Sequence, residues 1–151
     1  MSEEIFKIGD LKPLVDEFDK QISEIDQLAT AVLKTHFLIE EFIDLILEEV
    51  ARNPQHLELE RPFIQKVKWI RAFAPMGDDE RWQLILAINT LRNKVAHKFD
   101  GPERKAALQN LRKELICCIF NEQEWRDYDL ILAAATESRL FLVEIRNQIG
   151  K

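Results

Sequence analysis

Apolar residues recur at intervals of three and four along almost the whole chain, which is the spacing of an amphipathic helix. The first such segment begins near Asp10, a residue type that caps helices well. Its apolar positions continue over residues 14–50, so the segment is either one long helix or two helices joined near residues 24–27. Asn53-Pro54 ends it, because proline disfavours a helical conformation in the residue before it.

The same spacing and the stop signals between segments predict further helices after Pro54. They cover, to within a few residues, 61–74, 78–99, 102–120 and 123–148. No window shows the strict alternation of a β-strand flanked by hairpin turns. The pattern therefore predicts an all-α fold, an antiparallel up-and-down bundle of five or six helices in a single domain over residues 1–151.

Composition supports a folded domain and argues against a membrane protein. The chain has 151 residues, 46% hydrophobic and 32% charged, which is enough to build a sizeable core. No apolar run approaches the roughly 18 residues of a membrane span. The acidic start, Met1-Ser2-Glu3-Glu4, lacks the apolar centre of a signal peptide, so we expect no membrane association and a cytoplasmic location.

Charge is distributed unevenly along the chain. The net charge is −6, yet residues 53–113 carry +5 while residues 1–52 carry −8 and residues 114–151 carry −3. A basic middle segment on an acidic protein can bind an anionic ligand without a general affinity for DNA. The alternative is that these lysines and arginines are ordinary solvated surface groups.

The segment over residues 78–99 shows two different helical faces. One narrow stripe is apolar and is expected to pack into the bundle; it comprises Leu84, Ile88, Leu91, Val95 and Phe99. A second line is polar, with Asn89, Asn93 and His97 at successive intervals of four. Trp82, Leu86 and Ala96 lie beside this line, and Arg92 falls between the two faces.

Apolar side chains beside a polar line favour a partly buried cleft or a subunit interface. We therefore predict a homodimer with Trp82, Leu86 and Asn89 as interface residues, and regard the apolar-rich stretch over residues 130–143 as a second candidate surface. The alternative is a helix buried all round, with Asn89 and Asn93 satisfied inside the core.

The end of this helix carries side chains suited to phosphate chemistry. Arg92 offers a planar charged fork that matches phosphate oxygens, and His97 can exchange a proton near neutral pH. Arg92, Lys94 and Lys98 are the predicted phosphate-binding cations, with Asn93 orienting the phosphate or the imidazole. A simpler role is also open, since basic residues in a last turn stabilise the helix dipole.

Other candidate residues indicate no metal or cofactor. His36, His56 and His97 share no ligand spacing; His36 is expected to be a satisfied core or interface histidine, and His56 to lie in a loop. Cys117 and Cys118 are adjacent in an apolar stretch and are predicted to be core thiols, because neighbours on a helix point about 100° apart. The sequence shows no recognisable helix-turn-helix, zinc site or basic arm, so we do not expect sequence-specific DNA binding.

The segment Arg92-Asn93-Lys94-Val95-Ala96-His97 resembles the Arg-x4-6-His motif of HEPN domains, including the polar residue that often follows the arginine. Its local form is similar to a bacterial branch that includes relatives of the mannitol operon repressor. Residues 37–44 resemble the acidic, apolar second helix of that branch, and residues 63–73 resemble the helix before the motif. The resemblance covers roughly residues 25–115.

This resemblance implies a helical bundle, usually dimeric, in which the motifs of two subunits face one cleft. Many such domains are metal-independent endoribonucleases of toxin–antitoxin, antiviral or stress systems. In that case Arg92 would stabilise the scissile phosphate, Asn93 would assist, and His97 would act as general acid or base. Attack by the ribose 2′-OH would leave a cyclic phosphate end.

The resemblance also implies an alternative, because other HEPN-like domains have lost activity. These bind nucleotides, nucleic acid or proteins, so the chain could instead be a non-catalytic regulatory or interaction module of the mannitol-repressor type, including a transcriptional regulator. RNA or a nucleotide is the expected ligand in the first case and a protein partner in the second.

Overall fold

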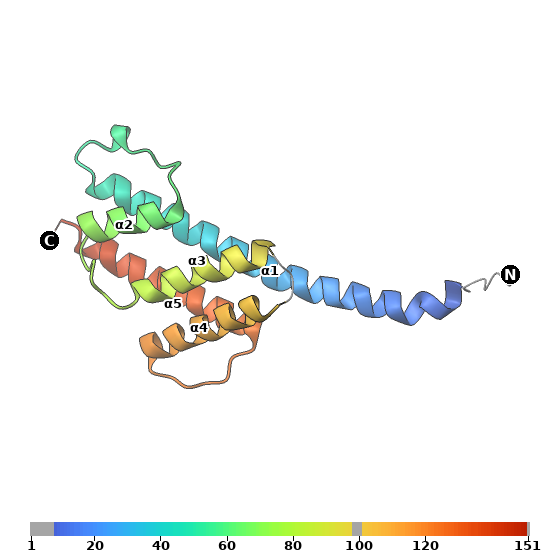
Figure 1. The fold of residues 1–151 in the computed structure, drawn as a ribbon. Helices are drawn as coiled ribbons and strands as arrows, with labels where there is room; N and C mark the ends of the chain where they lie inside the picture. The colour runs from blue at the N-terminus through green and yellow to red at the C-terminus, as the bar shows by residue number, and fades with distance from the viewer. Residues whose placement is uncertain (1–7, 98–100, 151) are drawn as a thin grey trace.

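The computed structural model describes residues 8–97 and 101–150, apart from the side chains of residues 8–10, 24–26 and 97. Within these ranges the chain forms five α-helices and one short 3-10 turn, and no strand (Figure 1). The elements are α1 (Ile8–Val50), η1 (Pro54–His56), α2 (Phe63–Phe73), α3 (Trp82–His97), α4 (Pro102–Ile119) and α5 (Asp127–Gln148). The predicted all-α helical bundle is confirmed.

The first segment is one continuous helix of 43 residues, which settles the alternative of two joined helices. At 1.5 Å per residue it is about 65 Å long. Its second half packs against α5, α3 and α2, whereas its first half projects away from the bundle (Figure 1). We call residues 8–23 the arm; every arm side chain from Leu11 to Ser23 is exposed.

Helix α3 forms the centre of the bundle and contacts α4, α1 and α5. The predicted apolar stripe is buried at Leu84, Ile88, Leu91 and Val95, while Phe99 lies outside the described residues. The stripe is wider than predicted, since Trp82, Ile85 and Ala87 are also buried. These additions surround α3 with apolar contacts on most sides of its first three turns.

The start of α3 is fixed by polar contacts from the preceding loop. The backbone N–H of Arg81 donates to Asp79 Oδ1 at 2.9 Å, and the Arg81 guanidinium also binds both Asp79 oxygens. These hydrogen bonds outweigh the effect of burial and lower the pKa of Asp79 below its usual value. Arg81 Nη1 in addition donates to Glu144 of α5 at 2.7 Å, so the loop ties α3 to the last helix.

Two details differ from the sequence prediction. Helix α5 begins at Asp127, four residues later than predicted, because residues 120–126 form an extended connection after Phe120 adopts a left-handed φ of 51°. Cys117 is exposed and Cys118 half-buried, so the prediction that both are core thiols is wrong for Cys117. Burial raises the pKa of the Cys118 thiol to about 11.

Candidate functional site

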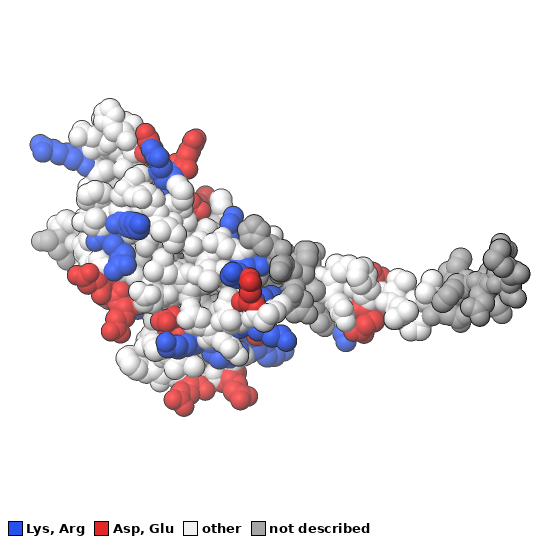
Figure 2. All heavy atoms as spheres, viewed as in Figure 1, with Lys and Arg blue, Asp and Glu red and all other residues white. Residues whose placement is uncertain are grey.

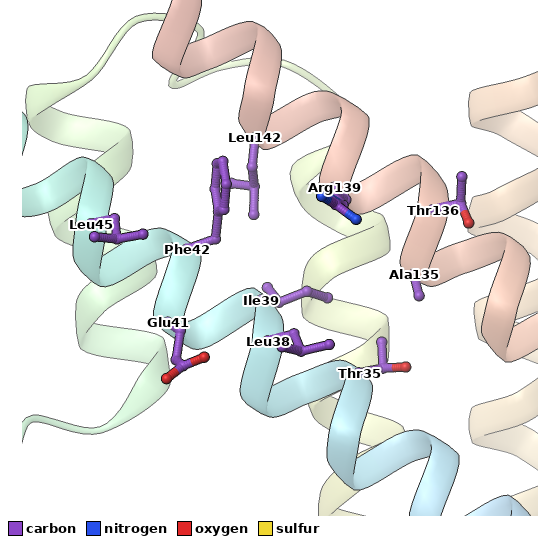
Figure 3. Close-up of a pocket in the computed structure, with 10 residues that line it drawn as sticks. All are labelled: Thr35, Leu38, Ile39, Glu41, Phe42, Leu45, Ala135, Thr136, Arg139 and Leu142. Carbon is purple, nitrogen blue, oxygen red and sulfur yellow. The ribbon is translucent and has the colours of Figure 1, made fainter.

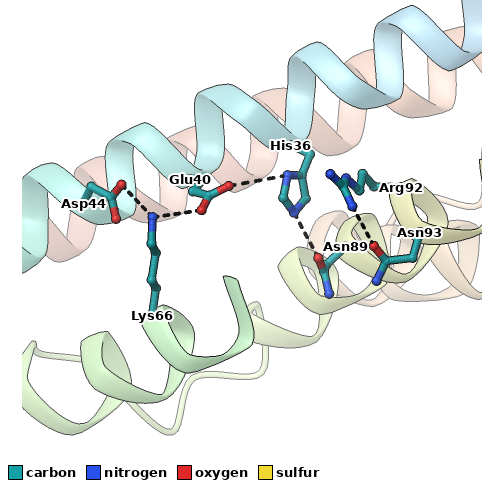
Figure 4. Close-up of polar contacts among 7 residues, drawn as sticks. All are labelled: His36, Glu40, Asp44, Lys66, Asn89, Arg92 and Asn93. Atoms are coloured by element: carbon teal, nitrogen blue, oxygen red, sulfur yellow. Dashed lines mark hydrogen bonds and ion pairs between the residues drawn. The ribbon is translucent and has the colours of Figure 1, made fainter. Parts of the chain in front are cut away.

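Arg92 and Asn93 lie side by side near the end of α3. Arg92 is a half-buried residue, and its Nη1 donates to Asn93 Oδ1 at 3.1 Å, while Asn93 itself is exposed (Figure 4). Among the described residues, no carboxylate forms an ion pair with Arg92. The cation is therefore held in place by an amide and keeps donors for an anionic ligand.

One turn before Asn93, the polar line passes into the interior. Asn89 is buried, and its Oδ1 lies 2.9 Å from Nε2 of His36 on α1. A carbonyl oxygen accepts, so His36 donates through Nε2 and leaves Nδ1 facing Glu40, 3.9 Å away. The His36 ring also packs against Phe63 of α2, with ring centroids 4.4 Å apart.

The environment of His36 favours its neutral form. Burial lowers its pKa, and the nearby cations Arg92 and Lys66 lower it further, while Asn89 and Glu40 oppose this only in part. Figure 4 shows the imidazole between the Arg92 end of α3 and the carboxylate of Glu40. Since the Arg92 charge acts on His36, the buried ring and the end of α3 belong to one electrostatic environment.

The network continues from Glu40 to α2. Lys66 is 4% exposed, and its Nζ donates to Glu40 Oε1 and to Asp44 Oδ2, both at 2.8 Å. Burial alone would lower the pKa of Lys66, but these hydrogen bonds and charges outweigh it and raise the pKa. The row of polar side chains therefore links α2 to α1 by the charge-assisted hydrogen bonds of Lys66, and α1 to α3 by the hydrogen bond between His36 and Asn89 (Figure 4).

The remaining predicted site residues are only partly placed. His97 is the last residue of α3, and its side chain lies outside what the structure describes; Lys98 lies outside the described residues altogether. Lys94 points to α4, where its Nζ forms an ion pair with Glu103 at 3.1 Å. The structure thus brings Arg92 and Asn93 together, pairs Lys94 with an acid, and leaves the placement of His97 a prediction.

The interface prediction is wrong for two of its three residues. Trp82 is 0% exposed: its indole Nε1 donates to Met76 O at 2.9 Å and its ring meets Phe141 edge-on. Asn89 is satisfied by His36 inside the core, as the alternative of a buried helix required, whereas Asn93, which that alternative also placed in the core, is exposed. Leu86 is half-buried against the core and stays untested as an interface residue.

Sequence reasoning missed the network around the motif. His36 was expected to be a satisfied buried histidine, which is confirmed, but its bond to the polar line of α3 was not foreseen. A signal was present: Glu40 and Asp44 are four residues apart on one helix, and Lys66 interrupts the apolar face of the next. Opposite charges placed among apolar positions on two packed helices tend to be partners.

A separate apolar groove of about 420 Å³ lies between α1 and α5 (Figure 3). Its polar groups are few, with Glu41 and Arg139 at its edges. The side chains that line it are Thr35, Leu38, Ile39, Glu41, Phe42, Leu45, Ala135, Thr136, Arg139 and Leu142. None of these residues belongs to the Arg92 site. The groove could therefore bury the apolar surface of a partner, but it has few polar groups that could bind or transform a substrate.

Cations and acids are interspersed over the body of the molecule, including the region of α3 and α4 (Figure 2). No group of three or more metal-ligating side chains occurs among the described residues. None of the described helices is both long and apolar enough to span a membrane. Comparisons with family models, with curated proteins and with solved structures find no match to this chain.

Proposed function

We propose that the end of α3 binds a phosphodiester of RNA and that the chain is a metal-independent endoribonuclease. The observation that carries the proposal is the state of Arg92. Arg92 is a half-buried residue whose guanidinium donates to Asn93, and within the described ranges it has no acidic partner. An arginine that is positioned but not neutralised is suited to receive phosphate oxygens.

The surroundings support this assignment. Two neighbouring cations are already paired, Lys66 with Glu40 and Asp44, and Lys94 with Glu103. The nearest buried base, His36, is kept neutral and therefore adds no charge that would compete with Arg92. An anion approaching this end of α3 thus meets in Arg92 a cation that no described carboxylate neutralises.

The proposed reaction uses the motif that resembles HEPN domains. The ribose 2′-OH attacks the adjacent phosphorus, the bond from phosphorus to the 5′-oxygen breaks, and a 2′,3′-cyclic phosphate and a 5′-OH result. Arg92 offsets the charge that develops on the phosphoryl oxygens. His97, at the end of the same helix, serves as the general acid or base that moves the proton.

The test is cleavage of a single-stranded RNA in EDTA by the wild-type chain and by Arg92→Ala and His97→Ala. We expect wild type to produce cyclic phosphate ends and each variant to lose at least about 100-fold in rate, the usual contribution of a general acid or base. Lys113→Ala, which removes an exposed cation elsewhere, is the matched control. Equal cleavage by wild type and His97→Ala would contradict the catalytic role.

A second function, a non-catalytic regulatory or interaction module, is favoured by a different observation. The arm and the groove between α1 and α5 expose apolar side chains on a chain of net charge −6. Apolar surfaces of this kind are typical of protein contacts rather than of nucleic-acid contacts. If purified protein binds RNA through Arg92 yet leaves it intact in the cleavage assay, this second function is the better account.

A further inference from the structure

The arm carries an apolar face that none of the residues described by the structure covers. Leu14 is 68% exposed and Phe18 62%, and both lie on a helix that projects clear of α2 to α5 (Figure 1). At 100° per residue, the exposed apolar positions of the arm fall within a sector of about 100°, the width of a face that packs against another helix. These positions are Leu11, Leu14, Val15, Phe18 and Ile22.

This face continues the buried face of the same helix. Every seventh residue along α1 is apolar, namely Leu11, Phe18, Ile25, Val32, Ile39 and Ile46. The last three are buried against the bundle, whereas Leu11 and Phe18 are exposed. A seven-residue repeat maintained over this length is the pattern of a helix that packs against other helices from end to end.

The arm lacks the packing that stabilises the second half of α1, since its side chains from Leu11 to Ser23 are exposed. Helices in proteins owe most of their stability to packing of their apolar face. The arm has Pro13 in its interior, which further weakens it. Coverage of the Leu11–Ile22 face would therefore stabilise the arm as well as remove apolar surface from water.

The charges at the edges of the arm indicate what kind of molecule would cover its apolar face. The arm sequence has four acidic residues against Lys12 and Lys20, which disfavours an anionic membrane surface or a nucleic acid. Lys12 and Asp19 lie on the same edge of the apolar face, seven residues apart. Two copies of the arm running antiparallel place Lys12 of each beside Asp19 of the other.

We propose that the arm binds the arm of a second copy of this chain, antiparallel, about a two-fold axis near residue 16. Leu14 then meets Phe18 of the second copy, and Leu11 meets its Ile22. Such an interface is isologous, so each contact occurs twice. In a parallel pair the Lys12 edge of one arm would instead face the opposite edge of the other arm, and the two bundles would lie at the same end.

The first test is the mass of the full chain in solution. Light scattering from about 5 to about 100 µM should show a species of twice 17.8 kDa. Phe18→Asp should abolish this dimer while the thermal unfolding of the bundle is retained. Lys20→Asp, on the outer face of the arm, is the matched control and should remain dimeric. A wild type that stays at 17.8 kDa, or a Phe18→Asp variant that stays dimeric, would overturn the proposal.

The second test fixes the direction of the arms. In a chain with Cys117→Ser and Cys118→Ser, Leu11→Cys and Ile22→Cys variants are mixed and oxidised. Antiparallel arms should give a disulfide between position 11 of one copy and position 22 of the other. Links of 11 to 11 and of 22 to 22 would show parallel arms and refute the arrangement. Neither test reads out RNA cleavage, so its failure leaves the proposed function untouched.

Discussion

The pKa of the buried His36 depends on its surroundings, including Arg92 at the candidate site. Its pKa is lowered because burial disfavours the charged ring, and Arg92 adds to this effect. The folded state therefore binds the His36 proton less readily than the unfolded state does. Between the lowered folded pKa and the unfolded value of about 6.5, the unfolded state holds more protons, so stability falls as pH falls through this window.

We accordingly predict that the wild type loses more stability than His36→Gln when the pH is lowered from about 7.5 to about 5.5. Glutamine removes the titrating group but keeps a side-chain amide able to bond Asn89. Urea unfolding at the two pH values measures the difference. His56→Gln, which replaces an exposed histidine of η1, is the matched control. Parallel pH profiles for wild type and His36→Gln would show that His36 titrates normally.

Gly77 gives a second prediction at the scale of one residue. A Cβ at this position would lie 2.1 Å from the backbone oxygen of Arg71, and backbone cannot move as a side chain can. Gly77→Ala should therefore destabilise the protein by about 1–3 kcal/mol, the usual cost of overpacking. A Cβ at Gly101 would meet nothing within 4 Å, so Gly101→Ala should lower the free energy of unfolding by less than about 0.5 kcal/mol. Denaturant midpoints of the two variants provide the comparison.

At the scale of elements, the network of Lys66 is a link between helices. Its two carboxylates are about a quarter exposed, so water offsets part of the cost of removing the lysine. We predict that Lys66→Met destabilises folding by about 1–3 kcal/mol, below the 3–5 kcal/mol of a fully buried pair. Lys68→Met, on the exposed side of α2, is the control and should change stability by less than about 0.5 kcal/mol. Equal effects of the two variants would show that the network adds nothing.

The elements themselves could be read from the sequence because their signals are local. Periodic apolar positions and the breaks at Pro54, Pro75 and Pro102 place the five helices to within a few residues. The start of α5 was missed by four residues, because residues 123–126 have no breaker of their own and the left-handed turn at Phe120 has no glycine to reveal it. The local sequence therefore predicts which segments are helical better than it predicts the residues at which each helix begins and ends.

The candidate site was harder to read, because it depends on contacts between helices. The cluster of Arg92 and Asn93 is visible in the sequence, as both residues share one turn. Helical periodicity places Trp82 beside the polar line, but packing of α3 between α1, α4 and α5 buries both Trp82 and Asn89. A helix at the centre of a bundle has little free surface, and its sequence alone does not say which neighbours cover it.

At the scale of the whole molecule, the chain separates a bundle from a projecting arm. The bundle contains the Arg92 end of α3, for which we propose phosphate binding, and the arm carries the exposed apolar face that we propose binds a second copy. The two features are tested independently, one by RNA and the other by mass and cross-linking. A dimer held by its arms would also raise the affinity for an RNA that spans both bundles, since the second contact becomes intramolecular.

The most direct test of the central claim, that the Arg92 end of α3 binds RNA phosphate, is the binding of a non-cleavable 2′-O-methyl RNA in EDTA. We predict that Arg92→Gln weakens binding by about tenfold or more, as loss of a charged hydrogen bond requires, and lowers the slope of log K against log salt by about 0.7. Lys113→Gln should leave the affinity of the Arg92 site intact. Equal affinity and equal salt dependence for wild type and Arg92→Gln would contradict the account.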